Sequence, residues 1–230
     1  MPTIQENITA VQKRLQQAAS DAGRNPAEIQ LLAVSKTRNI AQISQAITAG
    51  VFCFGENYLQ EAMDKIDQLD DSKLDWHFIG PLQSNKTRQA AENFAWVHTV
   101  DRVKIAQRLS AQRPDDMPAL NICLQINIDN EASKSGFNRD QAVEVAATIA
   151  QLPKLKLRGL MAIPKLRTVY KEQRQAFAQL RVLMEQINST LDNCHKLDTL
   201  SMGMSADLEA AVAEGATLVR VGTDIFGARN

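Results

Sequence analysis

The chain has 230 residues, of which 44% are hydrophobic and 23% are charged. This composition is typical of a soluble globular protein with enough apolar mass for a large core, and it argues against a disordered chain. The 26 basic and 26 acidic residues cancel, so the total charge carries no footprint for nucleic acid or an anionic membrane, and any anion site must be local.

Cysteine usage and the lack of export signals predict a cytoplasmic protein. The three cysteines, Cys53, Cys123 and Cys194, are odd in number and far apart, which favours reduced thiols over a disulfide framework. The segment Met1–Ala19 carries charged residues inside its apolar pattern, so no secretory signal is expected there. No run of 18 apolar residues occurs, so no membrane span is expected.

The chain opens with a predicted helix and continues as eight apolar runs separated by longer stretches. Ile4–Ala22 has apolar residues at helical spacing, and Gly23 follows as a stop signal. The segments between the runs are mostly long enough for crossover helices, as in Ile40–Ala49, Gln141–Leu152 and Val169–Leu191. The eight runs, rich in branched and aromatic residues, are expected to be strands: Ile29–Ser35, Val51–Gly55, Trp76–Ile79, Trp96–Val100, Leu120–Ile128, Leu157–Ile163, Thr199–Met202 and Thr217–Val221.

Eight strands joined by helices predict one α/β domain, residues 1–230, folded as a (β/α)8 TIM-type barrel with an extra N-terminal helix. No linker rich in Pro, Gly or Ser divides the chain. The alternative is a doubly wound open sheet, because periodicity cannot detect closure of a barrel. In a barrel, a ligand binds at the carboxyl ends of the strands, and phosphate favours the loops after the seventh and eighth strands.

Lys36 follows the first strand and shares the alternation of Leu32 and Val34, so its amine is expected to point into the mouth of the barrel. Partial burial disfavours the ammonium form and lowers the pKa of a lysine, which makes neutral amine available to attack an aldehyde. Such a lysine can form a Schiff base. The alternative is a lysine that extends to solvent from the strand end or pairs with a carboxylate.

The last two strands end in small and hydroxylated residues that suit a phosphate. Ser201 ends the seventh run, and Ser205 is expected to be the N-cap of a helix that stops at Gly215. Gly222 and Thr223 follow the eighth run. The backbone N–H groups and hydroxyls of these residues can surround three phosphate oxygens. The alternative is that Ser205 only caps its helix and Gly222 only turns the chain.

Arg220 shares strand parity with Leu218 and Gly222 and is expected inside the barrel. A guanidinium stays protonated and only donates, so it can hydrogen-bond the lone pair of a pyridine nitrogen but cannot hand it a proton. A cofactor held in this way is a weak electron sink and supports carbanion chemistry poorly. The alternative is an interior ion pair with Glu56 or Asp75.

Seven motifs, spread over nearly the whole chain, resemble one family. They are Leu32–Thr37, Phe54–Tyr58, Trp76–Lys86, Lys134–Phe137, Gly159–Met161, Leu200–Glu209 and Val219–Gly227. Together they are similar to the pyridoxal phosphate homeostasis protein family, also called the YggS/PROSC family, which shares its barrel with the N-terminal domain of alanine racemase. The resemblance implies that the cofactor is pyridoxal 5′-phosphate, which is kept bound, buffered and passed to apoenzymes, with effects on amino-acid metabolism and no settled turnover reaction.

By this resemblance Lys36 carries the cofactor as a Schiff base, and Arg220 meets its pyridine nitrogen. The phosphate contacts fall on Ser201, Gly222 and Thr223. The complete set of candidate cofactor-binding residues is Lys36, Asn57, His77, Ile79, Ser201, Met202, Ser205, Arg220, Gly222 and Thr223.

Three of these candidates lie on the second and third strands. The resemblance implies that Asn57 lies at the cofactor and that His77 and Ile79, which share a face of the third strand, line the pocket. The alternative for His77 is a satisfied core histidine. Asp224 departs from the family pattern, and because a carboxylate would repel phosphate, we expect it to face solvent or to cap the final turn.

Two enzymatic functions, an amino-acid racemase and a Schiff-base aldolase, are alternatives to a cofactor carrier. An amino-acid racemase has the same barrel and lysine but needs a second base; in alanine racemase that base comes from an additional C-terminal β-domain, and this sequence ends at Asn230, so sustained racemisation is not expected. Tyr58 follows the second strand but has no evident activating partner. The second enzymatic alternative is a Schiff-base aldolase that handles phosphate without a cofactor, and such an enzyme needs a general acid or base beside the lysine.

The remaining expectations concern metals and partners. The histidines and cysteines show no metal-ligand spacing, so no metal is expected. No nucleic-acid or membrane partner is expected either. We therefore predict a non-catalytic pyridoxal phosphate carrier that acts as a monomer and supplies PLP-dependent apoenzymes.

Overall fold

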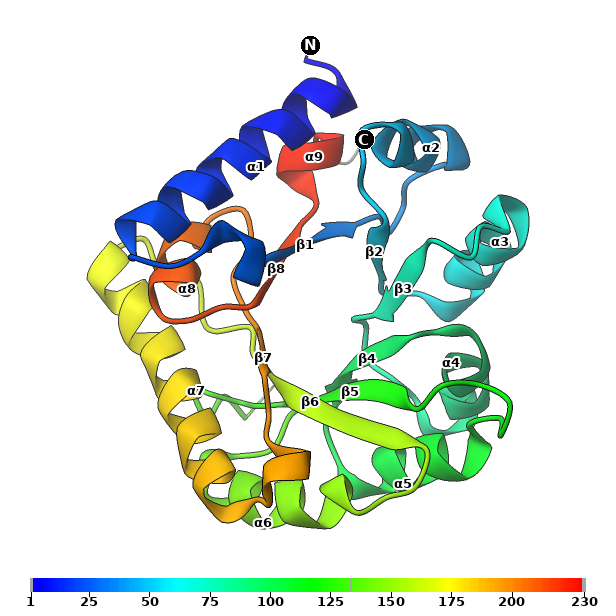
Figure 1. Ribbon diagram of the computed structural model, residues 1–230, viewed down its shortest axis with the longest axis vertical. Helices are drawn as coiled ribbons and strands as arrows, with labels where there is room; N and C mark the ends of the chain where they lie inside the picture. The colour runs from blue at the N-terminus through cyan, green and yellow to red at the C-terminus, as the bar shows by residue number, and fades with distance from the viewer. Residues whose placement is uncertain (1, 133, 229–230) are drawn as a thin grey trace.

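The barrel is described by a computed structural model that covers residues 2–132 and 134–228. Eight parallel strands form a closed ring, and helices surround it (Figure 1). The strands are β1 (Gln30–Val34), β2 (Cys53–Glu56), β3 (Asp75–Phe78), β4 (Trp96–Val100), β5 (Leu120–Gln125), β6 (Leu155–Met161), β7 (Thr199–Ser201) and β8 (Leu218–Val221). The α-helices are α1 (Ile4–Asp21), α2 (Ile40–Thr48), α3 (Leu59–Leu69), α4 (Thr87–Asn93), α5 (Val103–Gln112), α6 (Arg139–Ala150), α7 (Tyr170–Thr190), α8 (Leu208–Ala213) and α9 (Thr223–Phe226). Short 3-10 helices lie at Pro26–Glu28, Ser84–Lys86 and Asn193–His195.

Pairing between the first and last strands closes the barrel. β1 runs parallel to β8, with Leu32 beside Arg220 and Ala33 beside Val221. From β1 onward the order of strands around the ring follows the sequence. The predicted (β/α)8 barrel is therefore confirmed, and the alternative of an open doubly wound sheet is wrong. Local patterns cannot show this pairing because it joins segments at opposite ends of the chain.

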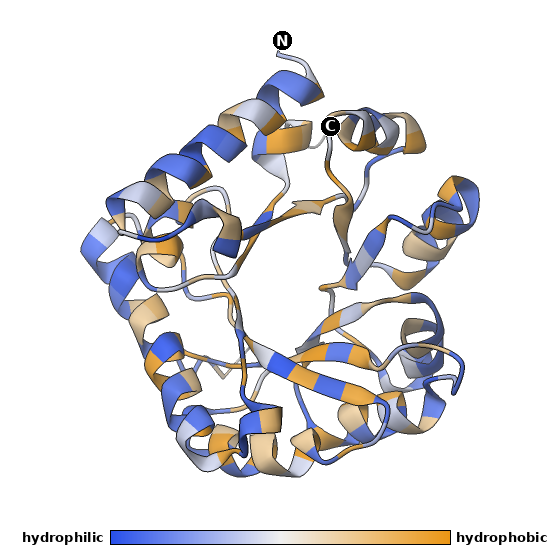
Figure 2. Ribbon diagram, viewed as in Figure 1, coloured by the Kyte–Doolittle hydropathy of each residue, from blue (hydrophilic) through white to orange (hydrophobic). Residues whose placement is uncertain are grey.

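The helices cover the barrel with one apolar face each. α1 begins with a capping box between Thr3 and Glu6 and buries Ile8, Val11 and Leu15. Figure 2 shows hydrophilic and hydrophobic residues interleaved along α1 and α7, as expected for helices with one side on the barrel. α1 packs against α8 and α9, so it reaches the loops that follow the last two strands (Figure 1). The extra N-terminal helix is thus confirmed.

β5 is shorter than the predicted run, Leu120–Ile128. Beyond its end, Ile126 makes only an isolated bridge to Phe137. The side chain of Asn127 then bonds the backbone N–H and carbonyl of Glu131. These side-chain bonds offer the backbone an alternative to the ladder, so the chain turns into a loop.

The three cysteines of the chain, Cys53, Cys123 and Cys194, are all free thiols. Burial raises the pKa of the Cys123 thiol to about 12, so this side chain behaves as part of the apolar core.

Across residues 2–132 and 134–228, no helix has the length and apolar character needed to cross a membrane.

Candidate functional site

A cavity of about 270 Å³ opens at the carboxyl ends of the strands, where a TIM-type barrel places its ligand. This volume is slightly below the usual range for small-molecule sites, so the cavity suits a small ligand. Its walls come from six strands and the loops after them: Val34, Lys36 and Arg38 from β1, Asn57 from β2, Ile79 from β3, Met161 and Ile163 from β6, Met204, Ser205 and Ala206 from β7, and Arg220, Gly222 and Thr223 from β8.

Lys36 lies at the mouth because β1 ends just before it. Val34 and Lys36 both line the cavity, as strand alternation predicts, and Lys36 is partly buried. The turn that follows is unusual, since Thr37 has a φ of 63°, in the left-handed region that a β-branched residue rarely adopts. The N–H of Thr37 donates to the Glu61 carboxylate at 2.5 Å. The strained turn is therefore held by a specific bond, as is common at functional sites.

A buried ion pair braces the same turn. Lys65 donates to Glu56 at 2.7 Å and to the carbonyl of Ser35 at 2.7 Å, and the Ser35 hydroxyl donates to Glu56 at 2.6 Å. Burial raises the pKa of Glu56, while the bond from Lys65 opposes that rise. These hydrogen bonds with Lys65 and Glu56 hold Ser35, the residue before Lys36, in place. Because Glu56 is engaged in this way, the alternative in which it pairs with Arg220 is wrong.

Arg220 lies on the floor of the cavity with 5% of its surface exposed. Its guanidinium donates to the carbonyl and hydroxyl of Ser201 at 2.6 and 2.7 Å and to the carbonyl of Ala162 at 3.0 Å. Burial lowers the pKa of Arg220 to about 10, so the group stays charged at neutral pH. Within the described ranges no carboxylate lies at ion-pair distance from it, so the alternative of a pair with Asp75 is also wrong.

The loops after β7 and β8 meet at one side of the cavity. Ser205, Gly222 and Thr223 line this side. A side-chain carbon on Gly222 would lie 3.3 Å from Val34, so glycine allows the two strands to approach closely here. Thr223 begins α9, and the first N–H groups of any helix have no partner within it. Hydroxyl and N–H donors therefore gather where an anion can bind.

Two features of these loops differ from the sequence expectations. Ser205 is not an N-cap: Asp207 occupies the cap position of α8, and its carboxylate accepts a hydrogen bond from the N–H of Met204 at 2.7 Å. Asp224 is only partly exposed to solvent, with 33% of its side chain accessible, and it also accepts a hydrogen bond from Arg14 at 2.8 Å, which was not expected. It is not among the residues that line the cavity.

Arg14 of α1 ties the two loops together. Besides Asp224, it donates to both oxygens of Glu209 at 2.8 and 2.9 Å and to the carbonyl of Ser205 at 3.0 Å. The hydrogen bond from Arg14 lowers the pKa of Glu209. The extra N-terminal helix is therefore part of the support of the site.

The structure brings seven of the ten candidate residues to the cavity, namely Lys36, Asn57, Ile79, Ser205, Arg220, Gly222 and Thr223. The other three lie deeper. The Ser201 hydroxyl is buried against Arg220 and His98, Met202 is fully buried in the apolar core, and His77 is fully buried in the barrel interior. His77 shares a face with Ile79, as predicted, but two residues of strand, about 7 Å, place it one layer below the cavity.

Sequence reasoning missed Arg38. This residue lines the cavity, donates to the carbonyl of Gly227 at 2.6 Å, and holds its guanidinium 5.9 Å from the centre of the Phe226 ring. Its position two residues after Lys36, in the same loop, was the available signal. The structure also shows that Asn57 Oδ1 is buried with no hydrogen-bond partner among the described residues, which marks an acceptor left for a ligand.

The cavity is cationic. Lys36, Arg38 and Arg220 line it, and its described lining contains no Asp or Glu. In a chain whose formal charges sum to zero, this concentration of positive charge favours an anionic ligand. Together with the hydroxyl and N–H donors of the last two loops, it suits a phosphate-bearing molecule that also presents an electrophile to the lysine.

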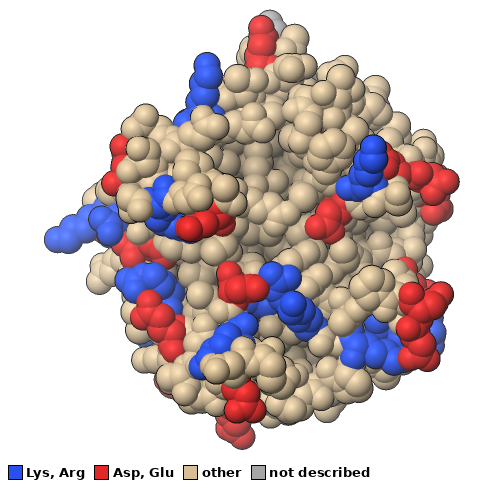
Figure 3. Space-filling view, viewed as in Figure 1, with Lys and Arg blue, Asp and Glu red and all other residues tan. Residues whose placement is uncertain are grey.

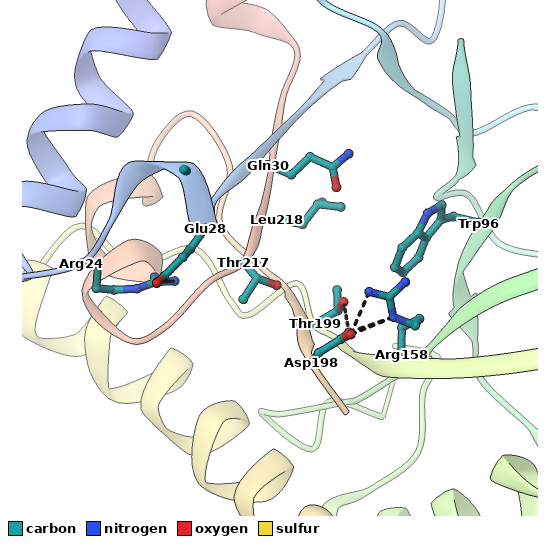
Figure 4. Close-up of a pocket in the computed structure, with 10 residues that line it drawn as sticks. Arg24, Glu28, Gln30, Trp96, Arg158, Asp198, Thr199, Thr217 and Leu218 are labelled. Carbon is teal, nitrogen blue, oxygen red and sulfur yellow. Dashed lines mark hydrogen bonds and ion pairs between the residues drawn. The ribbon is translucent and has the colours of Figure 1, made fainter. Parts of the chain in front are cut away.

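A larger hollow of about 690 Å³ lies at the opposite end of the barrel, around the first residues of several strands, including Gln30 and Trp96 (Figure 4). Here Arg158 donates to both carboxylate oxygens of Asp198, at 2.8 to 3.0 Å, and lies over the Trp96 ring at 4.9 Å. Figure 3 shows acidic and basic side chains intermixed around the central hollow of the face in view. Both cations of the described lining face a carboxylate, Arg158 that of Asp198 and Arg24 that of Glu28 at 3.9 Å, so the smaller cavity is the better anion site.

Comparison with known proteins agrees with this geometry. Residues 4–230 match the family described as alanine racemase, N-terminal domain. The whole chain is 56% identical to the pyridoxal phosphate homeostasis protein of Pseudomonas aeruginosa, covering 97% of it, and 50% identical to that of Escherichia coli, covering 98%. The solved structure of PipY from Synechococcus elongatus with PLP bound is 38% identical, with a TM-score of 0.81 over 93% of this chain and 99% of PipY. Alanine racemase from Corynebacterium glutamicum, 17% identical with a TM-score of 0.70 over 98% of this chain and 61% of its own, is similar in fold.

Proposed function

Because the chain belongs to the pyridoxal phosphate homeostasis protein family, with the fold of the alanine racemase N-terminal domain, we propose that it binds pyridoxal 5′-phosphate and maintains the intracellular supply of this cofactor. It thereby affects amino-acid metabolism. Lys36 holds the cofactor as a Schiff base, and the protein releases it to apoenzymes rather than sustaining a reaction of its own. The cyanobacterial relative with bound PLP supports the cofactor assignment.

One observation carries this proposal: three basic residues, Lys36, Arg38 and Arg220, line a small cavity whose described lining contains no carboxylate. Pyridoxal 5′-phosphate supplies an aldehyde, a pyridine ring and a phosphate. In the proposed arrangement, Lys36 meets the aldehyde, and the donors of Ser205, Gly222 and Thr223 hold the phosphate. Asn57 Oδ1, the buried acceptor without a described partner, fits beside the polar edge of the ring.

Arg220 supports the carrier function over sustained turnover. Its guanidinium is charged and only donates, so it can bind the pyridine nitrogen but cannot protonate it. A ring held in this way stabilises a carbanion poorly. Tyr58 is 56% exposed, and neither it nor Tyr170 is among the described residues that line the cavity. A tyrosine base for racemisation is therefore not supplied by that lining.

A titration with pyridoxal 5′-phosphate, followed by visible absorption, tests the proposal. We expect a saturable band in the wild type and in the surface control Lys13→Met, and no such band in Lys36→Met. With amino acids added, we expect no sustained racemisation or transamination. A wild type that develops no saturable band would overturn the cofactor assignment, and steady product formation would overturn the carrier function.

Delivery of the cofactor is tested separately. We expect the loaded protein to restore the activity of a PLP-dependent apoenzyme, because the cavity opens at the barrel mouth and the covalent link is reversible. Lys36, Arg220 and the donors of the last two loops meet within a single barrel, so we expect a monomer to suffice. Loaded protein that retains its cofactor in the presence of the apoenzyme, or binding that appears only in a dimer fraction on size-exclusion chromatography, would contradict these two points.

A further inference from the structure

A row of buried polar side chains runs through the barrel interior below the cofactor cavity. Arg220 Nη1 lies 2.7 Å from Ser201 Oγ, which lies 2.8 Å from His98 Nδ1; His98 Nε2 then lies 2.9 Å from His77 Nδ1. At the far end, His77 Nε2 lies 3.2 Å from Asp75 Oδ2. The first four residues are at most 5% exposed, whereas the Asp75 side chain is 34% exposed at the amino end of β3. The row therefore links the cavity floor to the opposite end of the barrel.

The chemistry of the groups sets the direction of the protons along this row. Arg220 only donates, so Ser201 Oγ accepts from it, and the serine proton is free to go to His98 Nδ1. His98 must then carry its proton on Nε2 and donate to His77 Nδ1. That places the His77 proton on Nε2, 3.2 Å from the Asp75 carboxylate, which is an electrostatic contact, because Nε2 has no hydrogen-bond partner among the described residues. Every donor points away from the cationic end and toward the anionic end.

If the protons of these hydrogen bonds were placed in the reverse direction, the donors and acceptors of the row would be less well satisfied. If His98 donated from Nδ1, Ser201 Oγ would receive two donors, and its own buried proton would have no acceptor within the hydrogen bonds of the described residues. The lone pair of His77 Nε2 would also face the Asp75 carboxylate. A single proton on His98 agrees with its surroundings, because burial, aided by His77 and Arg220, lowers its pKa well below the ordinary value. Electrostatics and hydrogen-bond valence therefore select the same arrangement.

We propose that His98 is a positioning residue for Arg220. The row Asp75–His77–His98–Ser201 sets the orientation of the guanidinium that binds the pyridine nitrogen of the cofactor. Three of the five guanidinium N–H donors end on Ser201 and Ala162, which fixes the plane of the group. Parallel stacking of the Trp96 ring on His77, at 5.3 Å and 6°, holds the lower part of the row. This inference rests on the proposed function only for its cofactor readout.

The lower end of the row also contains the set of atoms that most resembles a metal site. Ligand atoms of Cys53, Asp75 and His77 lie within 4.8 Å of one another. A zinc ion there would need the lone pair of His77 Nε2, and so would force the reverse direction of protons. The proposed arrangement puts a proton at that position. Zinc binding at this group is therefore an outcome that contradicts the proposal.

Histidine side-chain NMR of the ligand-free protein tests the direction of the row without any mutation in it. The chain has three histidines, and a His195→Gln variant assigns the surface one. We expect both His77 and His98 to be neutral with the proton on Nε2, and to remain so when zinc alone is added. A proton on Nδ1 of either residue, a doubly protonated His77, or stoichiometric zinc binding that a Cys53→Ser variant abolishes would each overturn the proposal.

Charge removal at the solvent end tests whether the row acts on the cofactor. Asp75→Asn removes the terminal negative charge, and Asp70→Asn makes the same change at an exposed carboxylate just after α3. We expect Asp75→Asn to mix the two tautomers of His98, shift the absorption maximum of the loaded protein and weaken pyridoxal 5′-phosphate binding about tenfold, the scale of one charge-assisted bond. Asp70→Asn should do none of these. Equal behaviour of the two variants would overturn the proposal. A wild type that binds no cofactor would overturn the proposed function instead, and the histidine tautomers measured by NMR would then be the test of this inference.

Discussion

Arg220 makes three buried hydrogen bonds that a lysine cannot reproduce, because an ammonium lacks the planar fork of a guanidinium. We expect Arg220→Lys to lower the free energy of unfolding of the ligand-free protein by about 2–4 kcal/mol, since buried acceptors lose their donors. Urea unfolding measures this. Arg38→Lys is the control, because Arg38 is only partly buried. Equal stability of Arg220→Lys and wild type would show that the bonds to Ser201 and Ala162 contribute little.

Glu209 gives a pH-dependent prediction at the same scale. Its pKa is lowered in the folded protein by the hydrogen bond from Arg14, so its contribution to stability is present above the unfolded pKa and is lost as pH falls through the folded pKa. Arg14→Met removes the cause of the shift. We expect the difference in stability between wild type and Arg14→Met to shrink as the pH falls from about 5 to about 3. A difference that stays constant over this range in urea unfolding would contradict the assignment.

The turn after β1 stores strain at the scale of an element. Thr37 has a φ of 63°, which costs a β-branched residue about 1 kcal/mol and which asparagine tolerates better. We expect Thr37→Asn to raise the free energy of unfolding by roughly that amount. Thr148→Asn, on an exposed helical position of α6, should give no gain. A Thr37→Asn variant that is less stable than wild type would mean that the threonine side chain has a contact of greater value than the strain.

Closure of the barrel makes a prediction for the whole molecule. β1 and β8 would be exposed edges in an open sheet, but here they pair with each other over Gln30–Ala33 and Leu218–Val221. We expect their backbone amides to exchange with solvent only through global unfolding, like those of β4 and β5. Native-state hydrogen exchange measures this. Exchange of β1 and β8 amides at a much lower free energy would indicate that the ring opens locally.

Much of this architecture follows from local patterns, whereas the depth of side chains does not. The eight strands, the opening helix and the inward direction of Lys36 and Arg220 all follow from period-two alternation and turn signals. Alternation tells which side of a strand a residue faces but not how far along the barrel axis it lies, so it could not show that His77, which the resemblance places in the pocket, lies below the cavity. The bonds of Arg14 and His98 join segments far apart in the sequence, and no local pattern predicts them.

We propose that Lys36 is the residue that holds pyridoxal 5′-phosphate. The most direct measurement is borohydride reduction of the loaded protein, followed by peptide mapping of the fixed cofactor. We expect one label per chain, on Lys36, and loss of that label in Lys36→Met. Label distributed over surface lysines, or a single label on another lysine, would contradict it.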